Sequence, residues 1–396
     1  MMNHKFITPE GTKDYLFDEV TARNSITKSL TALFHSNSYC EVVTPSLEYL
    51  DVFLGKGRGI PIEYMYKLVD HNGRLMVLRP DSTTPIARLC ATRLKDEKMP
   101  IRLYYNQAVY STTREMSGRS NEVLQAGVEL VGQSSQKSDL EVLTLAIRAL
   151  EQLHPLKFRI EIGHIGIFNT LIDSLNIDDE TKEQIRLCIE SKNYPALNDM
   201  LDKIGDNYEV SVLKQLPRLF GEEEVFDKAL SIINDEKTIG VLNYLKEIYQ
   251  KLKKLNTDGE ITVDFGVVNR TDYYTGVVFK GYIEGYFGEA VLSGGRYDNL
   301  MSGFLKDSGA IGFAVNVDAA ANALIHERGE ASKVDIIVFC NEGFEIESFE
   351  HIKAISTGHI VEFSLFDSLE ETIEYAKSKG ILRVDVVSDS VKMIEV

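Results

Sequence analysis

Two apolar runs separated by a charged segment constrain the fold of this chain more than any other feature of its sequence. The first run covers residues 103–110 and the second covers residues 123–131, and the segment between them carries Arg114 and Arg119. This pattern predicts two antiparallel strands joined by a charged loop.

The second run also places polar and small residues on one face. Gln125, Gly127 and Glu129 are spaced by two, so on a strand they share a face while the apolar residues between them face the other way. An amide, a glycine and a carboxylate would suit the floor of a polar pocket. The alternative is an edge strand with a solvated face, which antiparallel sheets often show. On this stretch alone the two interpretations are equal.

Length and composition limit the class of protein. A chain of 396 residues with 44% hydrophobic and 26% charged residues is typical of a globular protein with two or three domains. The N-terminus lacks the pattern of a secretory signal and no apolar run has the length of a bilayer span, so we expect a cytoplasmic protein without membrane contact. The four cysteines lack metal-site spacing, so we expect reduced thiols and no bound metal.

The charge balance argues against a nucleic-acid partner. The formal net charge is −17, and phosphate backbones are bound largely through lysine and arginine. The one dense basic cluster, Lys251, Lys253 and Lys254, ends a predicted helix, where cations also suit the helix dipole. We therefore expect no nucleic acid among the partners.

Periodicity in the first part of the chain predicts mixed helices and strands. Helical spacing predicts an amphipathic helix over residues 18–36, followed by a short strand that stops at Pro45. Residues 64–80 predict a hairpin with its turn at residues 71–73. Residues 82–85, Ser-Thr-Thr-Pro, are typical of the start of a helix.

Two short motifs predict local structure further along. Residues 138–141, Ser-Asp-Leu-Glu, have the pattern of a capping box at the start of a helix. The pair Gly294-Gly295 allows either a close approach of two backbones or a positive φ.

Longer patterns predict the domain organisation. Residues from about 178 to 255 are helical throughout, which predicts a helical module inserted into a strand-rich first domain of residues 1–325. Strands and helices alternate over residues 333–396, which predicts a small C-terminal α/β domain with a mainly parallel sheet.

Seven stretches, taken in order, resemble the class II histidyl-tRNA synthetases and together cover about residues 6–324. They are TPEGTKD from Thr8, VTPSLEY, LRPDSTTP, QAGVELVG, RTDYYTG, SGGRYDNL and IGFAVNVD. The resemblance implies an α+β fold with a class II aminoacyl-tRNA synthetase-like antiparallel sheet of six or seven strands flanked by helices. The helical module would stand in place of the family's insertion domain. The resemblance also implies a homodimer formed through the motif around Pro45.

The synthetase reaction needs fixed cations, because joining a carboxylate to ATP places charge on the α-phosphate. By resemblance the family supplies three arginines, and their positions here hold Ser111, Asn269 and Ala319. Arg270 is one residue from the second position, but a shift of one turns a strand side chain to the opposite face. Losing three contributions of about 2–4 kcal/mol each indicates that adenylation is absent. We expect a protein that is not itself an enzyme and carries no cofactor.

The amino-acid pocket, in contrast, is retained by resemblance. Its candidate histidine-binding residues are Asp81, Thr83, Gln125, Glu129, Tyr273, Tyr274 and Tyr297, with Asp81 in place of a family glutamate. Carboxylates and an amide suit an α-ammonium group, and tyrosines suit an imidazole. Each residue also has a structural explanation: a buried tyrosine usually bonds a backbone carbonyl, and Asp81 after a proline could be only a helix cap. Together they favour a retained pocket.

A chain with a histidine pocket and without the ATP-site arginines resembles the regulatory subunits of ATP phosphoribosyltransferase, and LRPD at residues 78–81 is close to that branch. The resemblance implies a non-catalytic subunit in the first step of histidine biosynthesis. Such a subunit binds a short catalytic subunit, is required for its activity and takes part in allosteric feedback inhibition by histidine. The implied complex is a hetero-octamer of four regulatory and four catalytic subunits.

Two other interpretations compete with this one. An active histidyl-tRNA synthetase would have to use Arg114, Arg119 or Arg270 in unusual roles. A tRNA-binding paralogue without catalysis would have to bind RNA with an acidic chain, and residues 333–396 alone carry a net charge of −7.

Overall fold

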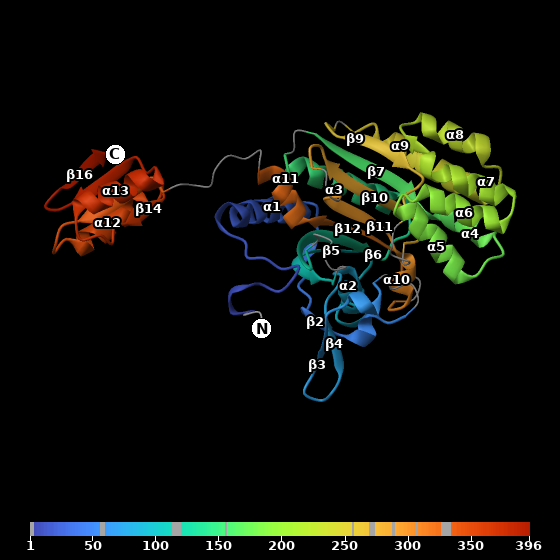
Figure 1. Cartoon of the computed structure of the whole chain (residues 1–396), viewed down its shortest axis with the longest axis horizontal. Coiled ribbons are helices and arrows are strands. Elements are labelled where there is room, and N and C mark those ends of the chain that lie inside the picture. The colour runs from blue at the N-terminus through green and yellow to red at the C-terminus, as the bar shows by residue number, and fades with distance from the viewer. Residues whose placement is uncertain are drawn as a thin grey trace. The chain divides into compact units, whose positions relative to one another are not determined.

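The computed structural model describes residues 4–55, 60–112, 120–154, 157–255, 257–268, 274–286, 290–305, 308–325 and 334–396. The chain divides into two compact units, Met1–Glu327 and Arg328–Val396 (Figure 1). Each unit is described by itself below.

The two apolar runs form the antiparallel pair that their pattern predicts. Strand β5 (Ile101–Tyr110) pairs with β6 (Glu122–Val131), and Gln107 lies opposite Gln125. On its other side β6 pairs antiparallel with β12 (Ala310–Asn316). The interpretation of β6 as an edge strand is therefore wrong, because both of its edges are hydrogen-bonded.

These strands belong to a nine-stranded sheet with the order β1-β5-β6-β12-β11-β10-β7-β9-β8. The remaining members are β1 (Cys40–Glu41), β11 (Leu292–Arg296), β10 (Val277–Ile283), β7 (Phe158–His164), β9 (Glu260–Asp264) and β8 (Phe220–Gly221). The centre is antiparallel as expected, whereas β1–β5 and β7–β9 pair in parallel. The sheet is therefore mixed and has more strands than the six or seven expected. Two of the additions, β1 and β8, have only two residues each and leave little periodic signal.

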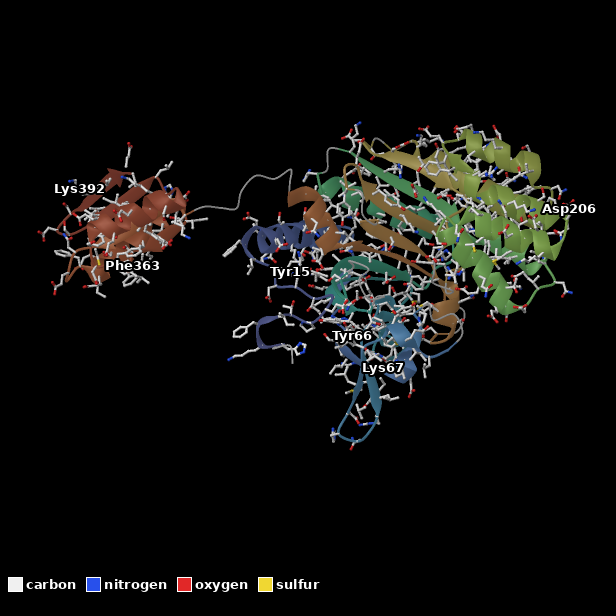
Figure 2. The ribbon with its side chains drawn as sticks, in the orientation of Figure 1. Tyr15, Tyr66, Lys67, Asp206, Phe363 and Lys392 are labelled. Atoms are coloured by element: carbon white, nitrogen blue, oxygen red, sulfur yellow. The ribbon has the colours of Figure 1, made fainter. Side chains whose placement is uncertain are left out.

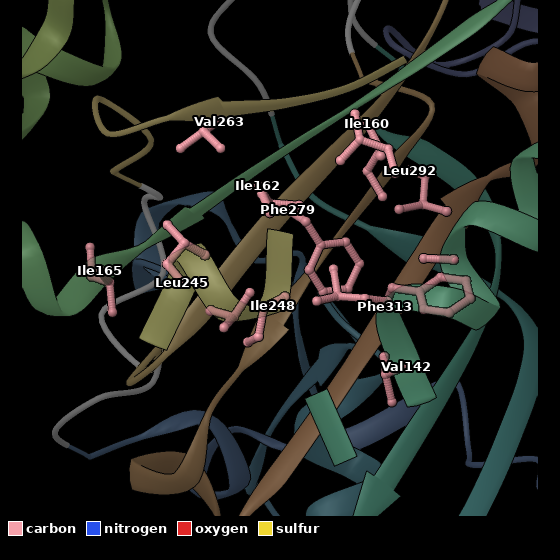
Figure 3. Packing of buried hydrophobic residues seen from close by; sticks show 14 of the residues in the cluster. Val142, Ile160, Ile162, Ile165, Leu245, Ile248, Val263, Phe279, Leu292 and Phe313 are labelled. Atoms are coloured by element: carbon pink, nitrogen blue, oxygen red, sulfur yellow. The ribbon is translucent and has the colours of Figure 1, made fainter. Parts of the chain in front are cut away.

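Helices α1 (Phe17–Ser36), α3 (Gln136–Gln152) and α11 (Val317–Ile325) pack against one face of this sheet. The core between helices and sheet includes Val142 of α3 with Phe279 and Phe313 of the sheet (Figure 3). Val128 and Leu130 of β6 join this core. The face of β6 that carries Gln125 and Glu129 is consequently turned away from it.

The start of α3 corrects one prediction. Its N-cap is Ser135, whose side chain accepts a hydrogen bond from the backbone N–H of Ser138. The predicted capping box at residues 138–141 was placed one turn too late. The side chains of Ser138 and Asp139 instead bond to Arg296 of β11.

A run of helices lies between β7 and β9, where the helical module was predicted, and it begins at Ile165, before the predicted start at about residue 178. It comprises α4 (Ile165–Asp173), α5 (Asp179–Glu190), α6 (Tyr194–Ile204), α7 (Tyr208–Gln215), a short 3-10 turn (Leu216–Arg218), α8 (Glu224–Ile232) and α9 (Glu236–Leu252). Asp178, Asn193, Asn207 and Asp235 cap four of these helices through their side chains. Helix α9 packs against β7, β9 and α3, which joins the module to the main sheet (Figure 1).

A separate three-stranded sheet lies before helix α2 in the chain. It has the order β2 (Leu47–Tyr49), β4 (Leu75–Leu78) and β3 (Lys67–Val69), and the predicted hairpin is formed by β3 and β4. Helix α2 (Thr83–Thr92) follows. Shorter helical turns are His4–Phe6, Leu50–Phe53, Ile62–Tyr64 and α10 (Asp298–Ser302).

The second unit is a small α/β domain. Its sheet has the order β14 (Val361–Phe363), β13 (Ile336–Cys340), β15 (Arg383–Val387) and β16 (Val391–Glu395), with the first three parallel. Helices α12 (Glu345–Ile355) and α13 (Leu369–Lys379) connect the parallel strands. Phe363 of β14 and Lys392 of β16 mark the two edge strands (Figure 2). The mainly parallel sheet expected for this block is present.

Two further properties concern the chain as a whole. No helix among the described residues is long and apolar enough to cross a membrane. All four cysteines are free thiols, and Cys90 is buried while Cys40 is exposed.

The two interpretations of Gly294-Gly295 are separated by the structure. Neither residue has a positive φ. A Cβ at Gly294 would lie against the backbone oxygen of Gly312 and the side chains of Phe313 and Phe279. Glycine is therefore needed here for close packing of β11 against its neighbours.

This packing predicts opposite effects for two glycine substitutions. Gly294→Ala should lower the free energy of unfolding by about 1–3 kcal/mol, because the added methyl group overfills a tight contact. Gly240→Ala is the matched control. Gly240 lies on the exposed side of α9 with nothing within 4 Å of a new Cβ, so alanine should stabilise by about 0.5–1 kcal/mol. Urea unfolding of both variants measures this, and an unchanged stability for Gly294→Ala would contradict it.

Candidate functional site

A small cavity of about 110 Å³ lies against the face of β6 that carries Gln125 and Glu129. It is smaller than the pockets of about 300–1,000 Å³ that hold drug-sized ligands, and so suits a ligand the size of an amino acid. Six of the predicted site residues line it, namely Asp81, Thr83, Gln125, Glu129, Tyr274 and Tyr297. The seventh, Tyr273, lies outside the described residues.

Glu129 is the most enclosed charged group of this cavity. Its side chain is 2% exposed, and the hydroxyl groups of Thr83 and Tyr297 donate hydrogen bonds to its two carboxylate oxygens, the first at 2.7 Å. Burial nevertheless raises the pKa of Glu129 to about 8, against the lowering effect of both hydrogen bonds. The Tyr297 hydroxyl therefore bonds the carboxyl group of Glu129, and not a backbone carbonyl as buried tyrosines usually do.

Asp81 combines a structural contact with a place in the cavity. Its carboxylate accepts the backbone N–H of Thr84 at 2.7 Å and the Thr84 hydroxyl at 3.1 Å, so Asp81 caps α2. Ser82 makes no capping bond with its side chain. Burial raises the pKa of Asp81 as well. The helix-cap explanation thus describes contacts that are present, while the same side chain lines the cavity.

The charge of the lining favours a cationic ligand. Two carboxyl groups, the buried Glu129 and the half-buried Asp81, face the cavity, and the described lining residues include no lysine or arginine. An ammonium group would supply the missing counter-charge and would favour the ionised form of both acids. A phosphate would meet like charge instead.

Glycines make room for this cavity. A Cβ at Gly312 would collide with the carboxylate of Glu129, and a Cβ at Gly127 would lie 2.6 Å from the hydroxyl oxygen of Tyr105. Strand register explains both contacts, because Gly312 pairs with Glu129 and Tyr105 pairs with Gly127. A side chain at Gly312 would take up space beside Glu129 in the cavity, and a side chain at Gly127 would displace Tyr105, which lines it.

Sequence reasoning missed several lining residues. They are Ser82, Tyr105, Ser293, Gly294, Gly312, Phe313 and Ala314. Ser293 and Ala314 come from β11 and β12, and they are brought to the site by pairing between strands far apart in the chain. The available signal was the run of small residues on these strands, which becomes meaningful only once the register is known.

Two of the three positions at which the resemblance implies a lost arginine, Ser111 and Ala319, lie among the described residues. The backbone N–H of Ser111 bonds the carbonyl oxygen of Asn121, just beyond the end of β5. Ala319 is 6% exposed and packs in the main core on α11. Asn269 and the candidate substitutes Arg114, Arg119 and Arg270 lie outside the described residues.

A larger cavity of about 910 Å³ lies between the helical module and the main sheet. Its described lining carries four carboxylates, Asp173, Glu209, Asp235 and Glu236, and one cation, Lys237. Tyr274 lines both cavities. This acidic lining is unsuited to the phosphates of a nucleic acid.

Comparison with known proteins shows the family to which this chain is similar. The family described as Histidyl-tRNA synthetase matches residues 11–320. The "ATP phosphoribosyltransferase regulatory subunit" of Clostridium kluyveri is 37% identical over 387 residues, which cover 96% of this chain and 99% of that protein.

Solved structures give the same picture of the fold. A structure described as an "ATP phosphoribosyltransferase regulatory subunit/histidyl-tRNA synthetase" from Bacillus halodurans C is similar with a TM-score of 0.84 and 30% identity, and the match covers 95% of this chain and 97% of that one. Histidyl-tRNA synthetase from Nostoc sp. PCC 7120 has a TM-score of 0.80 at 19% identity, covering 100% of this chain and 95% of that one. The second likeness shows the fold alone.

The burial of Ala319 predicts that an arginine cannot simply be restored there. Ala319→Arg should lower the free energy of unfolding by about 3–5 kcal/mol, because it places an uncompensated charge in the core. Asn322→Arg is the control, since Asn322 is exposed on the same helix and should change stability by less than about 0.5 kcal/mol. Equal stability of the two variants in urea unfolding would show that residue 319 is not a core position.

Proposed function

This chain belongs to the family of ATP phosphoribosyltransferase regulatory subunits, and we propose that it is the non-catalytic partner of a short catalytic subunit, conferring activity on it and inhibition by histidine. The observation that carries the proposal is the cavity beside β6, which holds two carboxyl groups, Asp81 and Glu129, and no cation among its described lining residues. Such a site favours a free amino acid over ATP.

The residues of the cavity can be assigned to the parts of histidine. Glu129 and Asp81 would face the α-ammonium group, with the Gln125 amide oxygen as a further acceptor. Tyr274 and Tyr297 would stand around the imidazole, offering aromatic walls and a phenol oxygen for a ring N–H. Tyr273 is assigned to the same wall by resemblance alone.

Loss of the synthetase reaction is the complementary part of the proposal. Ser111 and Ala319 supply no positive charge where an α-phosphate would need it, and Asn269 has a neutral side chain. Without such charge, adenylate formation loses its main source of transition-state stabilisation. The retained pocket then acts as a sensor, and its differential affinity for two states of the complex sets the inhibition.

Assembly is proposed to follow the pattern of the resemblance. The segment around Pro45 exposes apolar side chains, with Val43 at 78% and Leu47 and Tyr49 each at 44% exposure. An exposed apolar patch of this kind is typical of a protein interface. We assign it to a homodimer contact within a cytoplasmic hetero-octamer of four regulatory and four catalytic subunits.

The raised pKa of Glu129 predicts how histidine binding depends on pH. An ammonium ligand favours ionised Glu129, so binding below pH 8 requires release of the proton that the free protein holds. Affinity should therefore fall as the pH falls, and be about fivefold weaker at pH 7 than at pH 8. Calorimetry in two buffers of different ionisation enthalpy measures both the affinity and the proton release.

Two variants make this prediction specific. Glu129→Gln should weaken histidine binding and remove its dependence on pH between 7 and 8. Glu122→Gln is the control, because Glu122 lies on the same strand and bonds Tyr110 outside the cavity. Equal binding by the wild type and Glu129→Gln would exclude this carboxylate from the site.

The proposed partnership predicts the outcome of a reconstitution assay. The chain should co-purify with a short phosphoribosyltransferase subunit, and phosphoribosyl-ATP should form only when both are present. Histidine should inhibit the complex, and Asp81→Ala or Glu129→Ala should relieve that inhibition. The molar mass of the complex tests the four-plus-four assembly. Pyrophosphate exchange that depends on histidine would contradict the proposal, because it would show an active synthetase.

A further inference from the structure

A buried ion pair lies behind the proposed histidine pocket. Arg296 at the end of β11 is 7% exposed, and Asp139 on α3 is 1% exposed. Nε and Nη2 of Arg296 donate to Oδ1 of Asp139 at 2.9 and 2.5 Å. The rest of the guanidinium group is also satisfied, through the Ser138 hydroxyl at 2.7 Å and the backbone oxygen of Gln133 at 2.9 Å.

The second oxygen of Asp139 reaches the helical module. The hydroxyl group of Tyr244, on α9, donates to Oδ2 of Asp139 at 2.5 Å. The ring of His164 packs edge-on against Tyr244 with centroids 6.0 Å apart. Burial and the Arg296 charge lower the pKa of His164 to about 4, so this ring is neutral at pH 7. Asp139 is thus shared between the main sheet and the module.

On the other side, the ion pair leads directly to the pocket. Tyr297 follows Arg296 in the chain, and its hydroxyl donates to Glu129. Backbone bonds hold the segment between them: the N–H of Thr275 bonds the Arg296 oxygen at 2.7 Å, and the N–H of Tyr297 bonds the Ala310 oxygen at 2.8 Å. The route therefore runs by hydrogen bonds from Tyr244 of α9 through Asp139 to Arg296, along the peptide chain to Tyr297, and by a hydrogen bond from Tyr297 to Glu129.

Stability is a weak explanation for this arrangement. A buried ion pair must offset a large desolvation cost, and apolar residues of similar volume often serve equally well. A buried network in which every polar group is hydrogen-bonded instead fixes the orientation of each side chain, because each hydrogen bond has a preferred geometry. The member whose direction matters for the ligand is Tyr297.

We propose that Tyr244, Asp139 and Arg296 are positioning residues for the pocket: they hold Tyr297 toward Glu129 and make histidine affinity depend on the placement of the helical module. This inference rests on the proposed histidine site. It adds that the module is energetically coupled to that site. By reciprocity, histidine binding would in turn stabilise the present placement of α9.

The first test is a double-mutant cycle on histidine binding. Tyr244→Phe removes one hydroxyl from the network and should weaken histidine binding about five- to tenfold. Tyr297→Phe should weaken it at least as much, and the double variant should bind no worse than Tyr297→Phe alone, because both act through one chain of contacts. Tyr249→Phe is the control, a buried tyrosine on the same helix that packs against Phe226. Additive losses, or an unchanged affinity for Tyr244→Phe, would overturn the proposal.

The second test needs no ligand. If the chain of contacts couples the two regions, Tyr297→Phe should raise amide hydrogen exchange in α9 around Tyr244. Tyr104→Phe, in a buried tyrosine of β5 that bonds Glu41, should not. No rise in α9 would overturn the inference. Should the wild-type protein fail to bind histidine, the proposed function would fail, while this exchange experiment would still decide the coupling.

Discussion

The enclosed carboxylate of Glu129 is the constraint on which the site depends. A buried carboxyl group is tolerated only when hydrogen bonds replace the lost water, and Thr83 and Tyr297 provide them from α2 and from the segment after β11. Because β6 lies between β5 and β12, Glu129 is not on an edge strand, where its side chain could reach solvent. Strand β6, helix α2 and Tyr297 are therefore required together to hold Glu129, and the cavity lies between them.

The sequence predicted the parts of this arrangement that depend on local periodicity. Alternation along residues 123–131 was enough to put Gln125 and Glu129 on one face and Val128 and Leu130 in the core. The place of β6 within the sheet was beyond such reasoning, because an interior strand and an edge strand with one polar face have the same pattern. Only its pairing with β12, far along the chain, distinguishes the two.

Other features could not be predicted because the sequence allows more than one role for the same residue, or more than one residue for the same role. Ser135 and Ser138 both match a helix cap, and in the structure Ser135 is the N-cap while the Ser138 hydroxyl, one turn later, accepts the Ser135 backbone N–H and a hydrogen bond from Arg296. Asp81 caps α2 and lines the cavity at once, so its two interpretations were not exclusive. Tyr105 and Gly312 belong to the cavity through cross-strand register, which leaves no mark on a single sequence.

The retained and the missing charges point to one physical outcome. The cavity has two acids that would suit an ammonium ion, and in the proposed assignment the positions that would face a phosphate carry neutral side chains. The larger cavity beside it is acidic too, and the whole chain has a net charge of −17. Each of these fields repels a polyanion, and together they oppose both ATP and tRNA. In the proposed function, an amino acid would occupy this site without being activated, and the binding energy that a synthetase directs to a transition state would select between conformations of the complex.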